Sequence, residues 1–415
     1  MADPTRDAAF DLISAVFDRH SSLDAALGRL PPGTAPRDRA AAHRIAASVF
    51  RHAGSIDAIL DHHLRRAPPQ AVRHILRIGT AQVVFLETSA HAAVGTSVEL
   101  AKTRKLAPFA GLINAVLRRI AAEGKNVVST LDLPRLDTPP WLWASWGIRA
   151  RDIAIANGKE APLDLSLMPG AQPPPGANVL PTGTVRLPTG TDVTALPGFA
   201  RGDFWVQDAA ASLPARTLGN VRGRRVLDLC AAPGGKTAQL AAAGAHVTAV
   251  DRDGDRVRRL QENLQRLKLS AEIVVNDAVT YRPAEKFPFI LLDAPCSATG
   301  TIRRHPEILL RRRQDISACV KQQNRLLDAA LTMLAPGGLL AYAVCSLQSP
   351  EGEGVIDAAL DRHALMIDPI DVSIMPGLAG AISPRGLLQT DPSMWADQGG
   401  IDGFFVARLR RTHSA

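Results

Sequence analysis

The second half of the chain alternates between short apolar runs and longer amphipathic segments, and this alternation constrains the fold more than any other feature. One intervening segment, residues 254–269, places Val257, Leu260, Leu264 and Leu267 on one helical face. Strands that alternate with helices form a parallel sheet covered by helices on both faces. The apolar runs span residues 224–230, 245–251, 271–277, 287–295 and 337–347, and residues 402–411 are a further candidate strand.

The first third of the chain has a different pattern. Apolar residues recur three and four positions apart in residues 8–20, 71–88 and 111–124, which is typical of helices that bury one face. No run there alternates as a strand does, so we expect a compact all-helical bundle. Several arginines stand on these helices, either on solvated faces or together on one basic face: Arg44, Arg51, Arg73, Arg77, Arg118 and Arg119.

Between residues 126 and 203 the composition shifts to Pro, Gly and Thr. Prolines at this density break helices and confine strands to sheet edges, which predicts linkers and a small irregular or short-stranded subdomain. Trp141, Trp143 and Trp146 lie in this segment, either as packing anchors or as a platform for stacked bases. We therefore place the domains at residues 1–135, 136–203 and 204–415.

Charge and cysteine content narrow the class of protein. The 415 residues carry a net charge of +8, which favours a polyanionic partner unless the charge is spread evenly. Residues 1–135 contribute 18 Lys and Arg against 12 Asp and Glu. The acidic start lacks the apolar core of a signal peptide, and no stretch approaches a membrane span, so we expect a soluble cytoplasmic protein. The four cysteines include no Cys-x-x-Cys pair, which predicts free thiols and no metal site.

The stretch DLCAAPGGKT, residues 228–237, resembles a phosphate-binding loop of an ATPase. Such a loop needs a glycine five positions before its Gly-Lys pair, and that position holds Cys230. The stretch is better interpreted as a strand ending near Asp228, a turn through Gly234 and Gly235, and a helix. Glycines in such a turn let the backbone approach a ligand closely.

Acidic residues follow the next strands as well. Asp251 ends the second strand, where a carboxylate can accept hydrogen bonds from ribose hydroxyls, and Asn276 and Asp277 end the third. A dinucleotide is disfavoured because the turn lacks Gly-x-Gly-x-x-Gly. S-Adenosylmethionine fits better, since it has a ribose, an adenine and a sulfonium cation that tolerates carboxylates.

Two cysteines stand beyond the ends of later strands, Cys296 with Asp293 after the fourth and Cys345 after the fifth. A thiol is required when the methyl acceptor is carbon-5 of a pyrimidine, because attack on carbon-6 makes carbon-5 nucleophilic. Asp293 is placed to form a hydrogen bond with the edge of the base. The second thiol is placed to assist release of the methylated product. The pattern alone does not rank the two thiols. The segment 301–315 is rich in arginine and either grips phosphates or forms a solvated helical face.

These residues resemble the RsmB/Sun family of RNA 5-cytosine methyltransferases with an N-terminal NusB-like RNA-binding domain. The matching segments are DLCAAPGGKT, DRD at 251–253, ND at 276–277, and the stretches 204–215, 293–307, 345–353 and 402–409, with 76–88, 91–102 and 112–120 in the NusB-like part. The resemblance implies that Cys345 is the nucleophile and Cys296 the release thiol, with Asp293 as a third catalytic residue. It implies cofactor contacts from Cys230, Ala231, Ala232, Pro233, Gly234, Gly235, Lys236, Asp251, Asp277 and Asp293.

The fold implied is a Rossmann-like S-adenosylmethionine-dependent methyltransferase domain preceded by an all-α NusB-like domain and a small linker subdomain. The implied activity is methylation of a cytosine in small-subunit (16S) ribosomal RNA by a monomer without metal. Transfer RNA as substrate and a non-catalytic assembly factor are the alternatives. Three segments depart from the family pattern: Gly95, residues 163–170, and the PEGEG stretch at 350–354, which we expect to loosen the loop beside Cys345.

Overall fold

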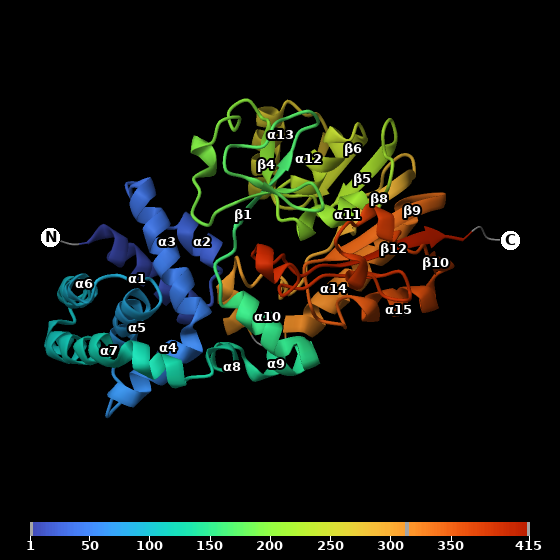
Figure 1. The fold of residues 1–415 in the computed structure, drawn as a ribbon. Coiled ribbons are helices and arrows are strands. Elements are labelled where there is room, and N and C mark those ends of the chain that lie inside the picture. The colour runs from blue at the N-terminus through green and yellow to red at the C-terminus, as the bar shows by residue number, and fades with distance from the viewer. Residues whose placement is uncertain (1–2, 312–314, 413–415) are drawn as a thin grey trace. The chain divides into compact units, whose positions relative to one another are not determined.

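The computed structural model describes residues 3–311 and 315–412 and divides into two compact units (Figure 1). The first unit comprises residues 1–159 and 302–312, and the second comprises residues 160–301 and 313–415. The fold class expected from the sequence, a helical region followed by an α/β region, is confirmed. The chain thus returns to the helical unit for a short segment in the middle of the α/β unit.

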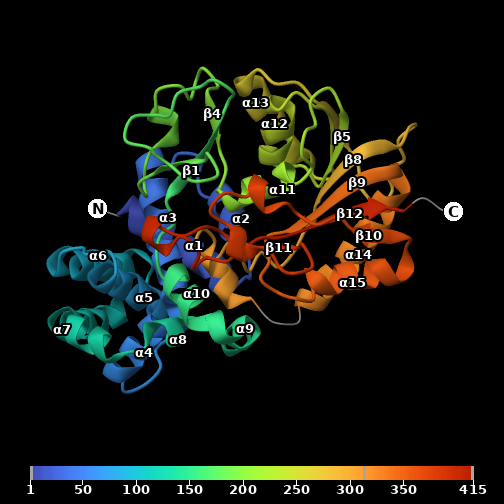
Figure 2. The same ribbon diagram turned by 45° about the vertical axis from the view of Figure 1, so that its right-hand side comes forward.

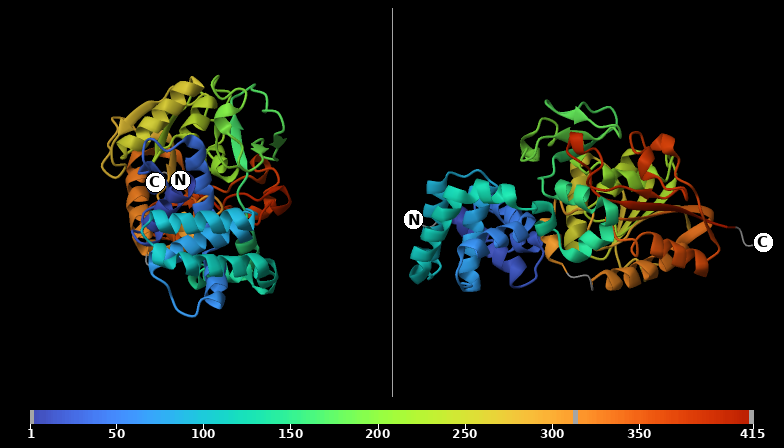
Figure 3. Two further views of the ribbon diagram at one scale, coloured as in Figure 1. Left: turned by 90° about the vertical axis from the view of Figure 1, so that its left-hand side faces the viewer. Right: turned by 60° about the horizontal axis from the view of Figure 1, so that its bottom comes forward.

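The first unit is a helical bundle, several of whose helices run side by side across the left panel of Figure 3. Its core is formed by apolar side chains with no exposed surface, including Leu12, Phe50, Ile75 and Leu117. The helices are α1 (Pro4–Phe17), α2 (Leu23–Gly28), α3 (Pro36–Arg51), α4 (Ala53–His63), α5 (Gln70–Val84), α6 (Ala90–Thr103), α7 (Ala110–Thr130), α8 (Leu133–Asp137), α9 (Pro140–Trp146) and α10 (Ala150–Asn157), with the returning 3₁₀ turn η5 (Pro306–Leu310).

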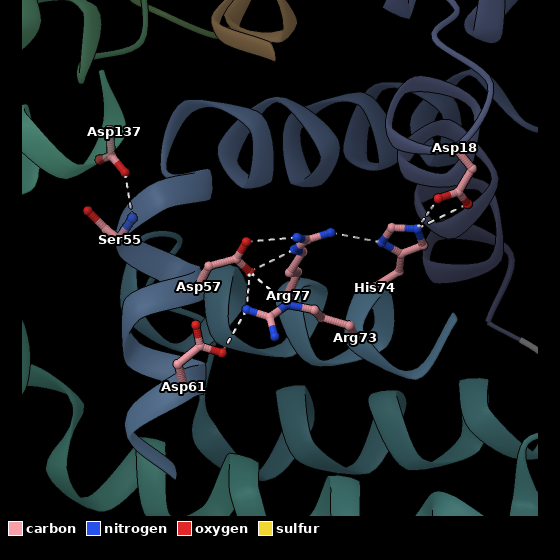
Figure 4. Close-up of polar contacts among 8 residues, drawn as sticks. All are labelled: Asp18, Ser55, Asp57, Asp61, Arg73, His74, Arg77 and Asp137. Atoms are coloured by element: carbon pink, nitrogen blue, oxygen red, sulfur yellow. Dashed lines mark hydrogen bonds and ion pairs between the residues drawn. The ribbon is translucent and has the colours of Figure 1, made fainter. Parts of the chain in front are cut away.

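Two arginines of this bundle, Arg73 and Arg77, form ion pairs between its helices (Figure 4). The Arg77 guanidinium is buried, bonds both oxygens of Asp57, and lies 4.2 Å from the centre of the Phe17 ring. Arg73 bonds Asp57 and Asp61. These two arginines therefore stabilise the contact between α4 and α5 and do not belong to a free basic face. Arg44, Arg118 and Arg119 are exposed.

Helices α8 to α10 lie in the segment where the sequence predicted linkers. Its prolines do not break these helices because Pro134 and Pro140 stand in their first turns, where a missing N–H costs no hydrogen bond. Trp146 is buried, and Trp143 lies under the guanidinium groups of Arg135 and Arg151. These contacts are those of packing anchors.

The second unit contains a small sheet and a large one. The small antiparallel sheet has the order β2-β3-β1-β4, and buried Arg186 on β3 bonds both carboxylate oxygens of Asp164 on β1. The large sheet has the order β10-β12-β9-β8-β5-β6-β7, with β11 paired to β12. The strands are β1 (Leu163–Leu167), β2 (Asn178–Val179), β3 (Val185–Leu187), β4 (Phe204–Val206), β5 (Arg225–Leu229), β6 (His246–Asp251), β7 (Glu272–Val275), β8 (Phe287–Asp293), β9 (Leu334–Val344), β10 (Leu365–Ile367), β11 (Leu388–Gln389) and β12 (Phe405–Arg411).

Strands β5 to β9 are parallel, as the sequence predicted, and β12 adds antiparallel to β9. Alternate residues of β8 face opposite layers: Ile290 and Leu292 pack with α14 and α15, and Leu291 packs with α11 and α12 (Figure 2). Such two-sided burial explains the continuous apolar runs of these strands. The helices of this unit are α11 (Leu213–Arg216), α12 (Gly235–Ala242), α13 (Gly254–Leu267), α14 (Asp315–Met333) and α15 (Glu353–Arg362).

Replacing glycine by alanine should have opposite effects on stability at two helical glycines of the first unit. Gly95 is exposed in the middle of α6, and a Cβ there would meet no atom within 4 Å. Gly95→Ala should therefore raise the free energy of unfolding by about 0.5–1 kcal/mol. Gly54, in the first turn of α4, would place a Cβ 1.9 Å from the Leu136 carbonyl oxygen, so Gly54→Ala should destabilise the unit. Chemical denaturation of both variants checks the pair, and a loss of stability in Gly95→Ala would contradict it.

Candidate functional site

The loop between β5 and α12 has the strand, turn and helix order that the sequence predicted. Cys230 and Gly234 both have positive φ, +61° and +99°, so the chain turns sharply between the strand and the helix. A Cβ at Gly234 would lie 2.7 Å from Cγ of Leu260 on α13, which explains the glycine there. The turn can therefore bring its backbone close to a ligand.

Acidic side chains gather at the carboxyl edge of the sheet beside this loop. Asp251 accepts hydrogen bonds from the backbone N–H groups of Ala232 (3.0 Å) and Asp253 (3.0 Å). A cavity of about 110 Å³ opens here, and the predicted residues Cys230, Asp251 and Asp277 all line it. Its remaining lining residues are Val250, Arg252, Arg256, Asn276, Ala278, Pro295, Gln322 and Leu326.

This cavity suits the adenosine part of S-adenosylmethionine. Carboxylate oxygens at a strand end accept from ribose hydroxyls, and the apolar wall from Ala278, Pro295 and Leu326 suits a purine ring. No triphosphate cradle is present in the turn, since Cys230 occupies the position of the first glycine. The carboxylates and the apolar wall of this cavity therefore match a nucleoside better than a nucleotide.

Lys236, the lysine of the DLCAAPGGKT stretch, forms an ion pair within the site. Its Nζ lies 2.7 Å from Oδ2 of Asp293, at the end of β8, and 5.1 Å from the centre of the Phe404 ring. Burial opposes the charge of the lysine, but the charge and hydrogen bond of Asp293 outweigh it and raise the lysine pKa. Lys236 thus holds Asp293 in place as a fixed cation.

The two cysteines that follow β8 and β9 meet at this edge. The Sγ atoms of Cys296 and Cys345 are 3.4 Å apart, within hydrogen-bond reach for sulfur. The Gly300 N–H donates to the Cys345 carbonyl, and the Gly403 N–H donates to the Gly300 carbonyl, so the loop after β8 is tied to both neighbouring segments. The hydrogen bond between the two thiols, together with burial, raises the pKa of the Cys296 thiol.

A buried glutamate that sequence reasoning missed joins the loops of the two cysteines. Glu351 has no exposed surface, and its carboxyl oxygens accept from the backbone N–H and hydroxyl of Ser297, the hydroxyl of Ser346 and the amide of Gln323. Ser297 and Ser346 directly follow Cys296 and Cys345. The expectation that the PEGEG stretch leaves this loop loose is therefore wrong, because its first glutamate, Glu351, connects the two loops by hydrogen bonds. We call this set of hydrogen bonds the Glu351 joint.

Asp228, near the end of β5, is buried beneath the site. Its Oδ2 accepts from the Thr237 hydroxyl at 2.6 Å, whereas Oδ1 has no partner among the described residues. Burial raises the pKa of this carboxyl to about 7. Burial likewise raises the pKa of the Cys230 thiol, so Cys230 is a poor nucleophile.

The arginine-rich segment 301–315 is only partly described, since residues 312–314 lie outside the described residues. Arg303 is buried, and its carbonyl accepts from Arg51 of α3. The hypothesis that this segment presents its arginines to phosphates is therefore wrong for Arg303, while Arg311 is exposed.

Within residues 3–311 and 315–412, no three His, Cys, Asp or Glu side chains come together in a way that would hold a metal ion. None of the helices described is both long enough and apolar enough to cross a membrane.

Comparison with known proteins agrees with this architecture. Residues 215–410 match the family model of the 16S rRNA methyltransferase RsmB/F, and residues 3–122 match that of the NusB family. A ribosomal RNA small subunit methyltransferase B from Vibrio cholerae is 37% identical over 440 residues, which cover 98% of both chains. One from Xanthomonas campestris is 37% identical over 390 residues, covering 87% of this chain and 88% of that protein. The chain belongs to the RsmB family of methyltransferases.

Membership in this RsmB family confirms the resemblance drawn from the sequence and S-adenosylmethionine as the cofactor of the family. Solved structures agree on the fold. The crystal structure of PH0851 superposes with a TM-score of 0.74 over 99% of both chains at 20% identity. A methyltransferase homolog from Pyrococcus horikoshii gives a TM-score of 0.53 at 26% identity, covering 69% of this chain and 98% of that one.

The Glu351 joint of this RsmB-family site predicts a large effect of a small substitution. Glu351→Gln keeps the shape but replaces one acceptor oxygen by an NH₂ group, which leaves buried donors unpaired. We expect unfolding free energy to fall by about 2–3 kcal/mol and iodoacetamide to alkylate Cys296 and Cys345 faster. Glu353→Gln, at an exposed glutamate two residues further on, is the matched control. Equal stability and thiol reactivity in the two variants would contradict the joint.

Asp228 predicts a pH dependence of stability. Because its pKa is raised from 3.8 to about 7, the native state binds a proton more tightly than the unfolded chain. Its contribution therefore falls as pH rises between about 4 and 7 and is constant above that range. Asp228→Asn should remove a slope of about 1.4 kcal/mol per pH unit, measured by denaturation at pH 5, 6 and 7. The control variant Asp397→Asn, at an exposed aspartate, should keep the wild-type slope. An unchanged slope in Asp228→Asn would contradict a raised pKa at Asp228.

Proposed function

We propose that this protein methylates carbon-5 of a cytosine in small-subunit ribosomal RNA through a covalent bond between Cys345 and carbon-6. The observation that carries the proposal is the 3.4 Å approach of the Cys296 and Cys345 sulfurs at the sheet edge that also holds the cofactor-type cavity. Its relatives named as small-subunit ribosomal RNA methyltransferases support this class of substrate.

The proposed roles of the two thiols rest on their proximity and on the family resemblance. The two sulfurs lie within hydrogen-bond reach of each other, and the raised pKa of Cys296 keeps its proton on sulfur. Because the segment 345–353 matches the family's nucleophile motif, Cys345 is proposed as the thiol that attacks. Its thiolate adds to carbon-6, and the electrons of the 5,6 double bond move so that carbon-5 becomes nucleophilic.

S-Adenosylmethionine, held at residues 230–236, Asp251, Asp277 and Asp293, would supply an electrophilic methyl group and would keep the electrons of the broken bond as a neutral thioether. Carbon-5 forms the new bond to the methyl carbon and then carries both the methyl group and its original proton. Loss of that proton to a base restores the 5,6 double bond and expels the Cys345 thiolate. Cys296, beside Cys345, assists this release.

Asp293 is the third proposed catalytic residue and also a cofactor contact. Lys236 holds one of its carboxylate oxygens, which fixes the orientation of the group at the end of β8. The other oxygen is proposed to accept from the amino group of the target cytosine and so orient carbon-6 toward the thiols. The remaining cofactor contacts proposed are residues 230–236, Asp251 and Asp277.

Methyl transfer with labelled S-adenosylmethionine tests the proposal. Wild-type protein should label small-subunit ribosomal RNA as 5-methylcytosine, and Cys345→Ala should lower the rate by roughly 10³-fold or more, as loss of a nucleophile does. Cys296→Ala should accumulate a covalent protein–RNA adduct on a denaturing gel. Cys319→Ala, at a half-buried cysteine of α14 that does not follow a strand of the sheet, is the control and should keep the wild-type rate.

Two outcomes would overturn parts of this proposal. Full transfer by Cys345→Ala would exclude it as the nucleophile. Labelling of transfer RNA in place of ribosomal RNA would reject small-subunit ribosomal RNA as the substrate. If wild type labels neither RNA, a non-catalytic RNA-binding role would remain.

A further inference from the structure

A buried asparagine in the helical unit has an unpaired amide. Asn157 ends α10 and is only 3% exposed, yet neither its side-chain oxygen nor its nitrogen has a hydrogen-bond partner among the described residues. A buried amide in this state costs stability, because it has lost water and gained no protein partner. An apolar residue of similar size would suit the fold better, which points to a ligand.

Asn157 lines a cavity of about 240 Å³ that lies wholly within this unit. Most of its wall is apolar, and a few polar groups come from α3, α8 and the end of α10. The remaining lining residues are Arg51, His52, Leu133, Pro134, Asp137, Thr138, Ala154, Ile155, Gly158, Lys159 and Leu309. The volume lies just below the ~300 Å³ at which pockets for drug-sized ligands begin, so the occupant is about as large as one ring system.

Contacts with the bundle hold two lining residues of the cavity, Asp137 and His52, in place. Asp137 accepts from the Ser55 backbone N–H of α4 at 2.8 Å (Figure 4), and its other oxygen lies 3.0 Å from Nδ1 of His52. The His52 ring stacks on Phe85 with centroids 3.9 Å apart. Two walls are thus fixed to the bundle before any ligand binds, and a preformed pocket saves the ordering cost of binding.

Charge identifies the class of ligand. Residues 1–159 and 302–312 contain 25 Lys and Arg against 15 Asp and Glu, a net charge of +10, whereas the rest of the chain has a net charge of −2. The net positive charge therefore attracts a polyanion to this unit more strongly than to the rest of the chain. Exposed Lys159 at the rim suits a backbone phosphate, and the amide of Asn157 offers one donor and one acceptor side by side.

We propose that this cavity binds one unstacked nucleobase of the RNA, with Asn157 pairing to adjacent donor and acceptor atoms on the base edge. This inference rests on the proposed function in taking RNA as the substrate. Asparagine recognises bases in this bidentate way, and single-stranded RNA is read by bases splayed into pockets. An apolar peptide side chain would leave the whole amide unpaired, and a phosphate, which offers only acceptor oxygens, would leave the Asn157 side-chain oxygen unpaired. The pocket thus reads sequence or shape at a distance along the RNA from the methylated base.

Binding of short RNAs to the full-length protein tests this inference. The probes are fluorescent hexanucleotides of A, C or U and an abasic hexanucleotide with the same backbone. Wild type should bind at least one base-containing probe about tenfold more tightly than the abasic one, the preference that a bidentate amide–base pair supplies. Asn157→Ala and Asn157→Leu should lose this preference, keep the abasic affinity and melt no lower than wild type. Asn126→Ala, at an exposed asparagine of α7, should behave as wild type.

Equal affinity of wild type for base-containing and abasic probes would overturn the pocket. An equal loss for both probes in the Asn157 variants would also overturn it, because the residue would then act on phosphates or on the fold. The binding assay contains no cofactor, so its result is independent of methyl transfer. Ribosomal RNA methylation by a wild type without base preference refutes this inference alone, and base preference without methylation refutes the proposed function alone.

Discussion

The parallel pairing of β5, β6, β8 and β9 is the constraint on which the site depends. Parallel strands end at the same edge of a sheet, so residues that are far apart in the chain meet there. The pairing of Asp293 with Ala343 sets the ends of β8 and β9 level, and the cysteines stand three and two residues beyond those positions. The thiols can approach to 3.4 Å only because the register is set in this way. A slip of one strand by one residue would turn its side chains to the other face.

A sheet edge alone does not hold two loops at a defined distance. The loops that carry Cys296 and Cys345 leave the sheet after their strands, so their backbone groups need other partners. Glu351 supplies acceptors to both loops, and the Tyr342 hydroxyl of β9 donates to the Glu351 carbonyl. The joint thus connects the core of the sheet to the thiols. A buried carboxyl with several donors rigidifies a site more than apolar contacts do, because each hydrogen bond has a direction.

Much of this arrangement could be predicted from the sequence. Apolar periodicity predicted the parallel strands, and their ends placed Cys230, Asp251, Asp277, Asp293, Cys296 and Cys345 at one edge. Periodicity could not predict Glu351, since Gly352 and Gly354, which follow it, indicate a loose loop and burial of a carboxyl has no local pattern. Proline content hid α8 to α10, because composition does not show whether a proline stands in a first turn or a helix interior. The return of residues 302–312 to the helical unit depends on long-range packing of η5 against α3, to which no local signal points.

The two units differ in what their charge achieves. In the α/β unit the acidic groups gather at the sheet edge, where Lys236 offsets Asp293 and a buried Asp228 with a pKa near 7 limits the negative charge that accumulates. A site of this kind accommodates a cationic ligand such as a sulfonium, whereas it repels bare phosphate. The helical unit carries the positive charge of the chain, yet Arg73 and Arg77 form ion pairs with Asp57 inside the bundle. Attraction of a phosphate backbone therefore rests on exposed residues such as Arg118 and Arg119, and attraction of this kind has no sequence preference. A unit that must also choose a position along the RNA needs a contact with a base, and an unpaired amide in a preformed cavity is a group that can make it.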